Sequence, residues 1–139
     1  MLPHNAARSF VAIMIAIALS AFFLRVAIEQ VMRITIERNE SDAVAALKLI
    51  SIALENYAKD NKGVFPGTLG SLIKTSPPYL AKDYISQSAI KGYIYNCSRL
   101  EPEGYNCSAV PTRCAVTGKK VFTVSTGGSL VTEDCRKKE

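Results

Sequence analysis

The sequence has 139 residues, of which 48% are hydrophobic and 21% are charged, and its formal net charge is +5. This length allows one modest domain with its own core and excludes a second full domain. The single histidine, His4, and the lack of a glycine-rich phosphate-binding loop exclude the common catalytic patterns, so we expect no enzyme activity, no cofactor and no small-molecule substrate.

The most informative segment is the stretch from His4 to Lys62, which contains neither glycine nor proline. A helix of that length is about 90 Å long at 1.5 Å per residue, several times the width of a small domain. Its first part, Phe10 to Leu24, carries no charge, whereas charged and aliphatic residues alternate from Arg25 onward. The sequence therefore predicts one long helix that serves two different environments.

Residues 10–38 are predicted to form a membrane or filament-core helix, preceded by a short flank or leader over residues 1–9. Nineteen residues lie between Phe10 and Ile28, close to the about 20 that a membrane-spanning helix needs. Arg25 stands near one boundary of this span, where its side chain can reach the lipid head groups. The residues expected to carry membrane insertion and assembly are Phe10, Val11, Met14, Ile17, Ala21, Leu24, Arg25, Ile28 and Glu29.

A cleaved secretory signal is the alternative interpretation of this segment. Arg8 would be its charged region, Phe10 to Leu19 its apolar region and Ala18-Leu19-Ser20 its cleavage site. Because the sequence stays apolar as far as Leu24, a retained anchor is favoured.

Charge and cysteine content give opposite orientations for the anchor. Arg8 is the only arginine or lysine before the span, and Arg25, Arg33 and Arg38 follow it, so the positive-inside rule alone would place the larger part in the cytoplasm. All four cysteines lie in the last 43 residues, and an even number beside a membrane segment is typical of an oxidising compartment. We give the cysteines more weight and expect the head, residues 39–139, outside the cytoplasm.

The head begins with a polar run, Asn39 to Asp42, which leaves open whether the helix continues through it. Apolar residues then return at spacings of three and four and form one stripe, which we expect to pack on a sheet. Gly63 is expected to end the helix in a left-handed turn. The stripe consists of Leu47, Ile50, Leu54 and Tyr57, and the predicted parts are an amphipathic helix over 39–62, a connector over 63–91, a sheet over 92–135 and a basic tail over 136–139.

The connector is predicted to contain two short helical pieces, Thr68 to Lys74, with Thr68 as its cap, and Ala81 to Ser86. Beyond it, short runs rich in tyrosine, valine, phenylalanine and threonine alternate with turn residues, which predicts four short antiparallel strands. The fold class is therefore α+β, a long N-terminal α-helix packed on a small antiparallel β-sheet of three to four strands. The predicted strands are Gly92–Cys97, Gly104–Val110, Lys120–Ser125 and Ser129–Thr132.

The four cysteines are predicted to form two disulfides, because none belongs to the close ligand pair that zinc sites usually contain. Three connectivities are open. We prefer Cys97–Cys107, which would link the first hairpin, together with Cys114–Cys135, which would tie down the C-terminal hairpin and tail. Each would stabilise the head by about 3 kcal/mol in the chain-entropy model.

Other charged and aromatic groups are interpreted without a binding role. Lys119-Lys120 and the run from Arg136 to Lys138 suit nucleic acid or anionic surfaces, but solubility is the simpler explanation and nucleic acid is not an expected partner. Tyr93, Tyr95 and Tyr105 are expected in core or cross-strand packing. The head's acidic loop residues lack the ligand spacing of a calcium site, and we expect no metal; they are Glu101, Glu103, Glu133 and Asp134.

Short motifs along the chain support one family resemblance. Tyr57 to Pro66 places a tyrosine, a polar run, a glycine, an aromatic residue and a proline in succession. With the helix that precedes it, this exit resembles that of type IV pilin and type II secretion pseudopilin subunits. The connector and head residues that are similar to those of the family are Leu69, Leu72, Pro77–Leu80, Gly92–Tyr95, Gly104-Tyr105, Ala109–Pro111, Gly118, Phe122 and Gly127–Leu130.

The resemblance implies a structural subunit that is anchored in the membrane and assembles through its N-terminal helix with copies of itself or other pilin-like subunits. Its head would be extracytoplasmic and, once assembled, part of a cell-surface or extracellular filament. The family has a glycine before the mature chain and a glutamate early in it, whereas here Ser9 precedes Phe10 and Met14 takes the glutamate's place. We therefore expect an atypical subunit, or a minor pseudopilin of a secretion or DNA-uptake system. A non-polymerising single-pass membrane-anchored binding module is the alternative.

Overall fold

The computed structural model describes residues 4–137 and divides into two units, the first ending at Ile34 and the second beginning at Thr35. Helix α1 (His4–Asp60) accounts for the described part of the first unit and continues as the first element of the second. The predicted flank over residues 1–9 and the predicted basic tail over residues 136–139 both extend beyond the described residues.

The polar run Asn39 to Asp42, left open by the sequence, stays helical within α1. The helix ends at Asp60, and Gly63 takes part in the left-handed turn that follows, as predicted. Lys62 and Gly63 both adopt positive φ values, +58° and +84°, and the Gly63 N–H donates to the Ala58 carbonyl oxygen at 2.7 Å. This left-handed turn satisfies a free carbonyl of the last helical turn and redirects the chain.

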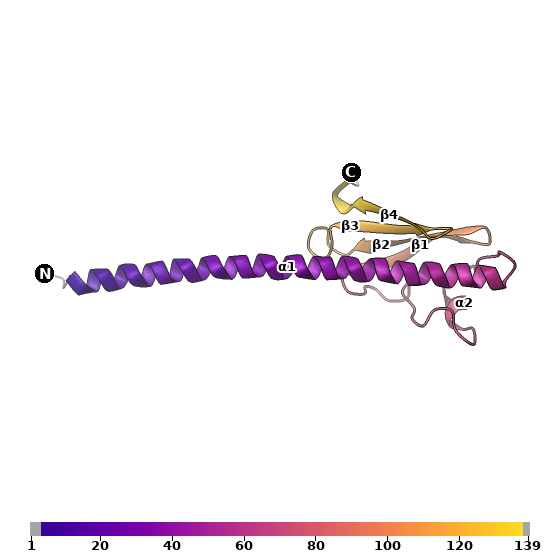
Figure 1. Cartoon of the computed structure of the whole chain (residues 1–139), viewed down its shortest axis with the longest axis horizontal. Helices are drawn as coiled ribbons and strands as arrows, with labels where there is room; N and C mark the ends of the chain where they lie inside the picture. The colour runs from indigo at the N-terminus through magenta and orange to yellow at the C-terminus, as the bar shows by residue number, and fades with distance from the viewer. Residues whose placement is uncertain (1–3, 138–139) are drawn as a thin grey trace. The chain divides into compact units, whose positions relative to one another are not determined.

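Four antiparallel strands follow in the order β1-β2-β3-β4, each paired with its neighbour in the sequence (Figure 1). The fold class is therefore α+β, as predicted. An irregularity in register between Cys97 and Arg99 interrupts the pairing of the first two strands. The strands are β1 (Tyr93–Glu101), β2 (Gly104–Pro111), β3 (Lys120–Ser125) and β4 (Ser129–Asp134), and the three-residue 3-10 helix η1 (Cys135–Lys137) follows β4.

The core lies between the sheet and the part of α1 that belongs to the second unit (Figure 1). Leu47, Ile50 and Leu54 of the predicted stripe are buried there, and Tyr57 is partly buried, with its ring edge-on to that of Tyr79 at 5.6 Å. The sheet contributes alternate residues, as period-two side chains require. The three tyrosines predicted to pack in the core do so, and the sheet residues of the hydrophobic core are Tyr93, Tyr95, Tyr105, Cys107, Ala109, Phe122 and Val124.

Hydrogen bonds also tie α1 to the far end of the sheet, at the turn between β3 and β4. The Glu55 carboxylate accepts from the Tyr105 hydroxyl at 2.9 Å and from the backbone N–H of Gly127 at 2.7 Å. The Tyr105 hydroxyl also lies 2.8 Å from Ser51 Oγ. Since Ser51 is buried, this contact satisfies a hydroxyl that would otherwise lose its water.

The connector differs from the prediction in two places. The helical piece expected over Thr68–Lys74 is only α2 (Gly70–Ile73), and Thr68 does not cap it, because its hydroxyl lies 3.0 Å from Ser71 Oγ. The helix expected over Ala81–Ser86 does not form. The Asp83 carboxylate instead accepts from the backbone N–H groups of Ile85 and Ser86, at 3.0 and 3.1 Å, and side chains that bond nearby backbone in this way compete with helix.

Three strands are longer than predicted. β1 continues to Glu101, four residues beyond the predicted end, and β2 and β4 end at Pro111 and Asp134. Apart from Ser98, which lies at the irregularity in register, these extra residues are paired across the hairpins. Pairing with a neighbouring strand holds polar residues in extended structure that their own preferences do not indicate.

Candidate membrane and assembly helix

The apolar part of α1 exposes its side chains on every face. All residues over 9–35 are exposed, and the exposed fraction is 65% for Phe10, 55% for Met14 and 63% for Leu24. In the part of the chain that the structure describes, Ser9–Asp60 is the one helix long and apolar enough to cross a membrane. A helix that is apolar all round suits a bilayer or a bundle of similar helices rather than water.

The first half of this segment also carries small residues, which allow close approach between helices. Ala16, Ala18, Ser20 and Ala21 lie within two turns. The Ser20 hydroxyl donates back into the helix, at 2.9 Å from the carbonyl oxygens of both Ala16 and Ile17. It therefore needs no partner from water or from a neighbour.

The charged groups nearest the apolar run form a pair one helical turn apart. Arg25 Nε lies 3.4 Å from Glu29 Oε1, and the two side chains are 81% and 68% exposed. In water such a pair contributes little to stability. In an apolar environment the pair matters more, because each charge then has a partner and an unpaired buried charge is strongly destabilising. The other predicted assembly residues, Val11, Ile17, Ala21 and Ile28, are exposed on the same segment.

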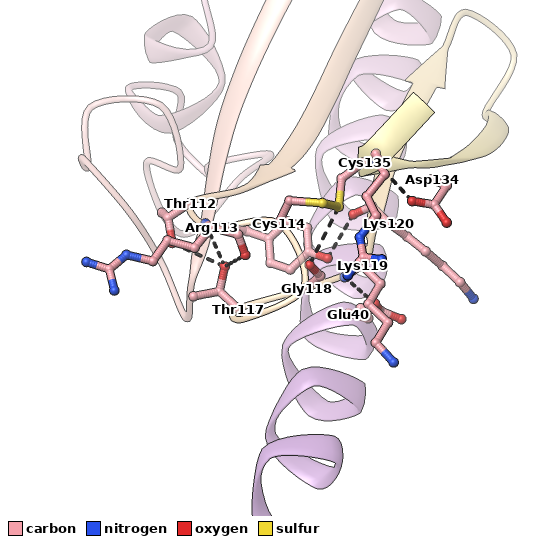
Figure 2. Close-up of a disulfide and its surroundings, with 12 residues drawn as sticks. Glu40, Thr112, Arg113, Cys114, Thr117, Gly118, Lys119, Lys120, Asp134 and Cys135 are labelled. Carbon is pink, nitrogen blue, oxygen red and sulfur yellow. Dashed lines mark hydrogen bonds between the residues drawn. A yellow bond between two sulfur atoms is a disulfide. The ribbon is translucent and has the colours of Figure 1, made fainter. Parts of the chain in front are cut away.

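The second disulfide organises the end of the head at which α1 enters it. Cys114 pairs with Cys135, joining the loop after β2 to the end of β4 (Figure 2). The loop is also bound to α1, because the Asn39 amide donates to the Thr117 carbonyl oxygen at 2.9 Å and the Lys119 N–H donates to the Glu40 carboxylate at 2.8 Å. Asn39 and Glu40 of the polar run therefore bind this loop to the helix.

Both disulfides have the connectivity that the sequence favoured among three. Cys97 and Cys107 stand directly opposite each other in the β1–β2 register, with their Cα atoms 3.9 Å apart. Asn39 and Glu40 were not predicted as contact residues. Their partners are 78 and 79 residues away, and the only signal in the sequence is that polar side chains occupy a helical stretch at the boundary of the head.

Among the titratable groups of the head whose pKa is shifted, none has its pKa moved toward neutral pH. Burial raises the pKa of Tyr95 to about 12, and burial also raises the pKa of Tyr93 and Tyr105. A hydrogen bond to the Asp60 carboxylate, 2.6 Å away, raises the pKa of Tyr79. Within the described residues, no three His, Cys, Asp or Glu side chains come together in a way that would hold a metal ion.

No protein-family model matches this chain, and no curated protein matches it in a sequence search. An apolar helical segment with exposed side chains belongs to the same helix that forms the spine of a disulfide-linked sheet.

Proposed function

We propose that this chain is a structural, non-enzymatic subunit of the pilin-like plan, which is anchored in a membrane by the apolar part of α1 and assembles through it into a pilus or pseudopilus filament. The observation that carries the proposal is the exposure of the side chains over residues 9–35. Leaving that surface in water is unfavourable by about 25 cal/mol per Å² of apolar area. A bilayer before assembly, and equivalent helices after it, both cover this surface.

The disulfides support an extracytoplasmic head. All four cysteines are paired within the second unit, and disulfides persist in oxidising compartments and are rare in the cytosol. With the span over Phe10–Ile28 in the membrane, the head would lie on the periplasmic or outer side and become surface-exposed in a filament.

The experiment that tests assembly is charge reversal at Arg25. Arg25→Glu places two carboxylates one turn apart at the end of the apolar run, where a packed core has no water to solvate them. We expect the variant to lose sedimentable filaments while its head stays folded with both disulfides. Lys59→Glu, an exposed lysine in the last turn of α1, is the matched control and should assemble normally.

A swapped pair sharpens this test. Arg25→Glu combined with Glu29→Arg keeps both charges one turn apart, so it should recover assembly if Glu29 is the partner that Arg25 needs in the filament. Normal filaments from the single Arg25→Glu variant would show that Arg25 is not buried in the filament core, and the absence of filaments from the wild-type chain would contradict the proposal.

Two departures from the family pattern, Ser9 and Met14, favour a second candidate, a membrane-anchored binding module that does not polymerise. In that case Arg25→Glu would lose only part of its membrane retention. Mass spectrometry of the mature N-terminus adds a second discriminator. A chain that begins at Phe10 would support pilin-type processing, and one that begins at Ala21 would show a cleaved signal and remove the anchor from both candidates.

A further inference from the structure

Two basic segments that are far apart in the sequence meet at the end of the head where α1 enters it. The Cys114–Cys135 disulfide joins the loop between β2 and β3 to the residues after β4 (Figure 2). We call the two segments, 113–120 and 136–137, the basic base. Its cationic side chains are all exposed, and none makes an ion pair with another residue that the structure describes. These side chains are Arg113, Lys119, Lys120, Arg136 and Lys137.

Acids also lie beside the basic base, and two of them accept backbone N–H groups from it while keeping their negative charge. Glu40 accepts from the backbone N–H of Lys119 at 2.8 Å, and Asp134 accepts from the backbone N–H of Arg136 at 2.9 Å. Asp42 pairs with Lys91 at 2.8 Å. Glu37 and Glu133 are also exposed. Apart from the Asp42–Lys91 pair, five cations stand against four carboxylates, those of Glu37, Glu40, Glu133 and Asp134, which leaves an excess of one positive charge. An excess of cations that are not engaged in ion pairs is a surface suited to anionic partners.

This surface follows the predicted membrane span at a short distance along the chain. Glu40, which holds the loop at Lys119, lies twelve residues after Ile28, the end of the predicted span. Twelve helical residues span at most about 18 Å, which is an upper bound on the separation between Glu40 and the end of the predicted span. The lipid head groups occupy about 5 to 7 Å on each side of the bilayer. The remaining gap is about one Debye length at 0.1 M salt.

We infer that the basic base binds the anionic phospholipid head groups of the membrane in which the same chain is anchored. Clusters of basic residues close to the membrane are attracted to negatively charged leaflets, and the attraction falls off within a Debye length. The inference rests on the membrane anchor of the proposed function and does not depend on filament assembly. Its consequence is that the head is held at the membrane surface before the subunit is incorporated.

The test uses the full chain reconstituted in vesicles of phosphatidylcholine alone, or of phosphatidylcholine with phosphatidylglycerol. Hydrogen–deuterium exchange is measured for the backbone amides over residues 112–120 and 135–137. We expect exchange at least threefold slower in the anionic vesicles, and we expect the difference to disappear in about 0.5 M salt, where screening shortens the electrostatic range.

Two triple variants, each lacking three positive charges, distinguish an effect of this surface from an effect of the total charge. Arg113→Gln, Lys119→Gln and Arg136→Gln together should abolish the lipid-dependent difference. The control removes three exposed lysines elsewhere in the head, through Lys48→Gln, Lys59→Gln and Lys74→Gln, and should keep it.

The possible results distinguish failure of this inference from failure of the anchor. A chain that floats with both kinds of vesicle but shows equal exchange in them overturns this inference alone. A chain that floats with neither overturns the anchor and this inference together. A third outcome combines two observations: exchange shows no lipid-dependent difference, and wild-type chain in phosphatidylcholine discs retards duplex DNA whereas the triple basic-base variant does not. This outcome would assign the surface to nucleic acid and overturn the inference.

Discussion

Tyr93 and Gly118 fit together so closely that no larger residue can stand at position 118. Tyr93 is fully buried, and its hydroxyl donates to the Lys120 carbonyl oxygen at 2.9 Å. A Cβ atom on Gly118 would collide with this hydroxyl and would lie 2.6 Å from Cζ of the same ring. The buried ring cannot move aside without disturbing the core around it.

Gly118→Ala is therefore expected to destabilise the head by about 1 to 3 kcal/mol, the usual range for overpacking. Denaturant unfolding of the full chain in mild detergent would measure the loss. Gly67→Ala is the matched control, since a Cβ there meets no atom within 4 Å. If the two variants were equally stable, the described packing of Tyr93 would be wrong.

Tyr95 makes the stability of the head depend on alkaline pH. Burial raises its pKa to about 12, with the neighbouring Tyr84 and the Asp42 carboxylate adding to the effect. An unfolded tyrosine has a pKa of about 10, so between about pH 10 and 12 the folded state holds a proton that the unfolded state releases. The free energy of unfolding must then fall as the pH rises through this interval.

Tyr95→Phe removes this titration, so its free energy of unfolding should fall less steeply between about pH 10 and 12 than that of the wild type. The remaining slope comes from the other tyrosines whose pKa is raised, Tyr79, Tyr93 and Tyr105. Unfolding curves collected at closely spaced pH values would check this. Parallel curves for the two proteins would contradict a buried, neutral Tyr95.

At the scale of elements, the two disulfides close loops of different length in the same sheet. Cys114 and Cys135 are 21 residues apart, and Cys97 and Cys107 are 10 apart. Replacing Cys114 and Cys135 with alanine should cost about 3 kcal/mol of stability, and replacing Cys97 and Cys107 slightly less, since the entropy of the unfolded chain depends on loop length. Equal or reversed costs would show that native packing, and not loop length, dominates.

The elements that the sequence predicted well are those specified by local pattern. The absence of glycine and proline specifies α1, and the stripe Leu47, Ile50 and Leu54 specifies its buried face. The helix predicted over Ala81–Ser86 failed because a single carboxylate, Asp83, satisfies two backbone N–H groups outside a helix.

Contacts between residues far apart in the chain could not be predicted from the sequence. Asn39 with Thr117, and Glu55 with Gly127, are bonds across 78 and 72 residues, and no local pattern links one partner to the other. The basic base was visible only as two separate short runs, because the disulfide and the antiparallel order of β2, β3 and β4 bring them together.

In the molecule as a whole, one long helix, α1, runs through two units of different character. In its first unit residues 9–34 are exposed and mostly apolar, and its second unit contains a core, a sheet and both disulfides. A domain with a buried core has no need of an additional exposed apolar helix for its own stability, so that helix is retained for an environment outside the head. We propose that the environment is a membrane first and a filament afterwards.

Electron microscopy of material sheared from cells that produce the native chain tests this claim most directly. With a gold-labelled antibody against the head, we expect thin filaments that carry the label, whether this chain is their main or a minor component. In cells that produce Arg25→Glu, we expect no label on filaments. Label confined to membranes and to dispersed monomers in detergent, in both strains, would contradict it.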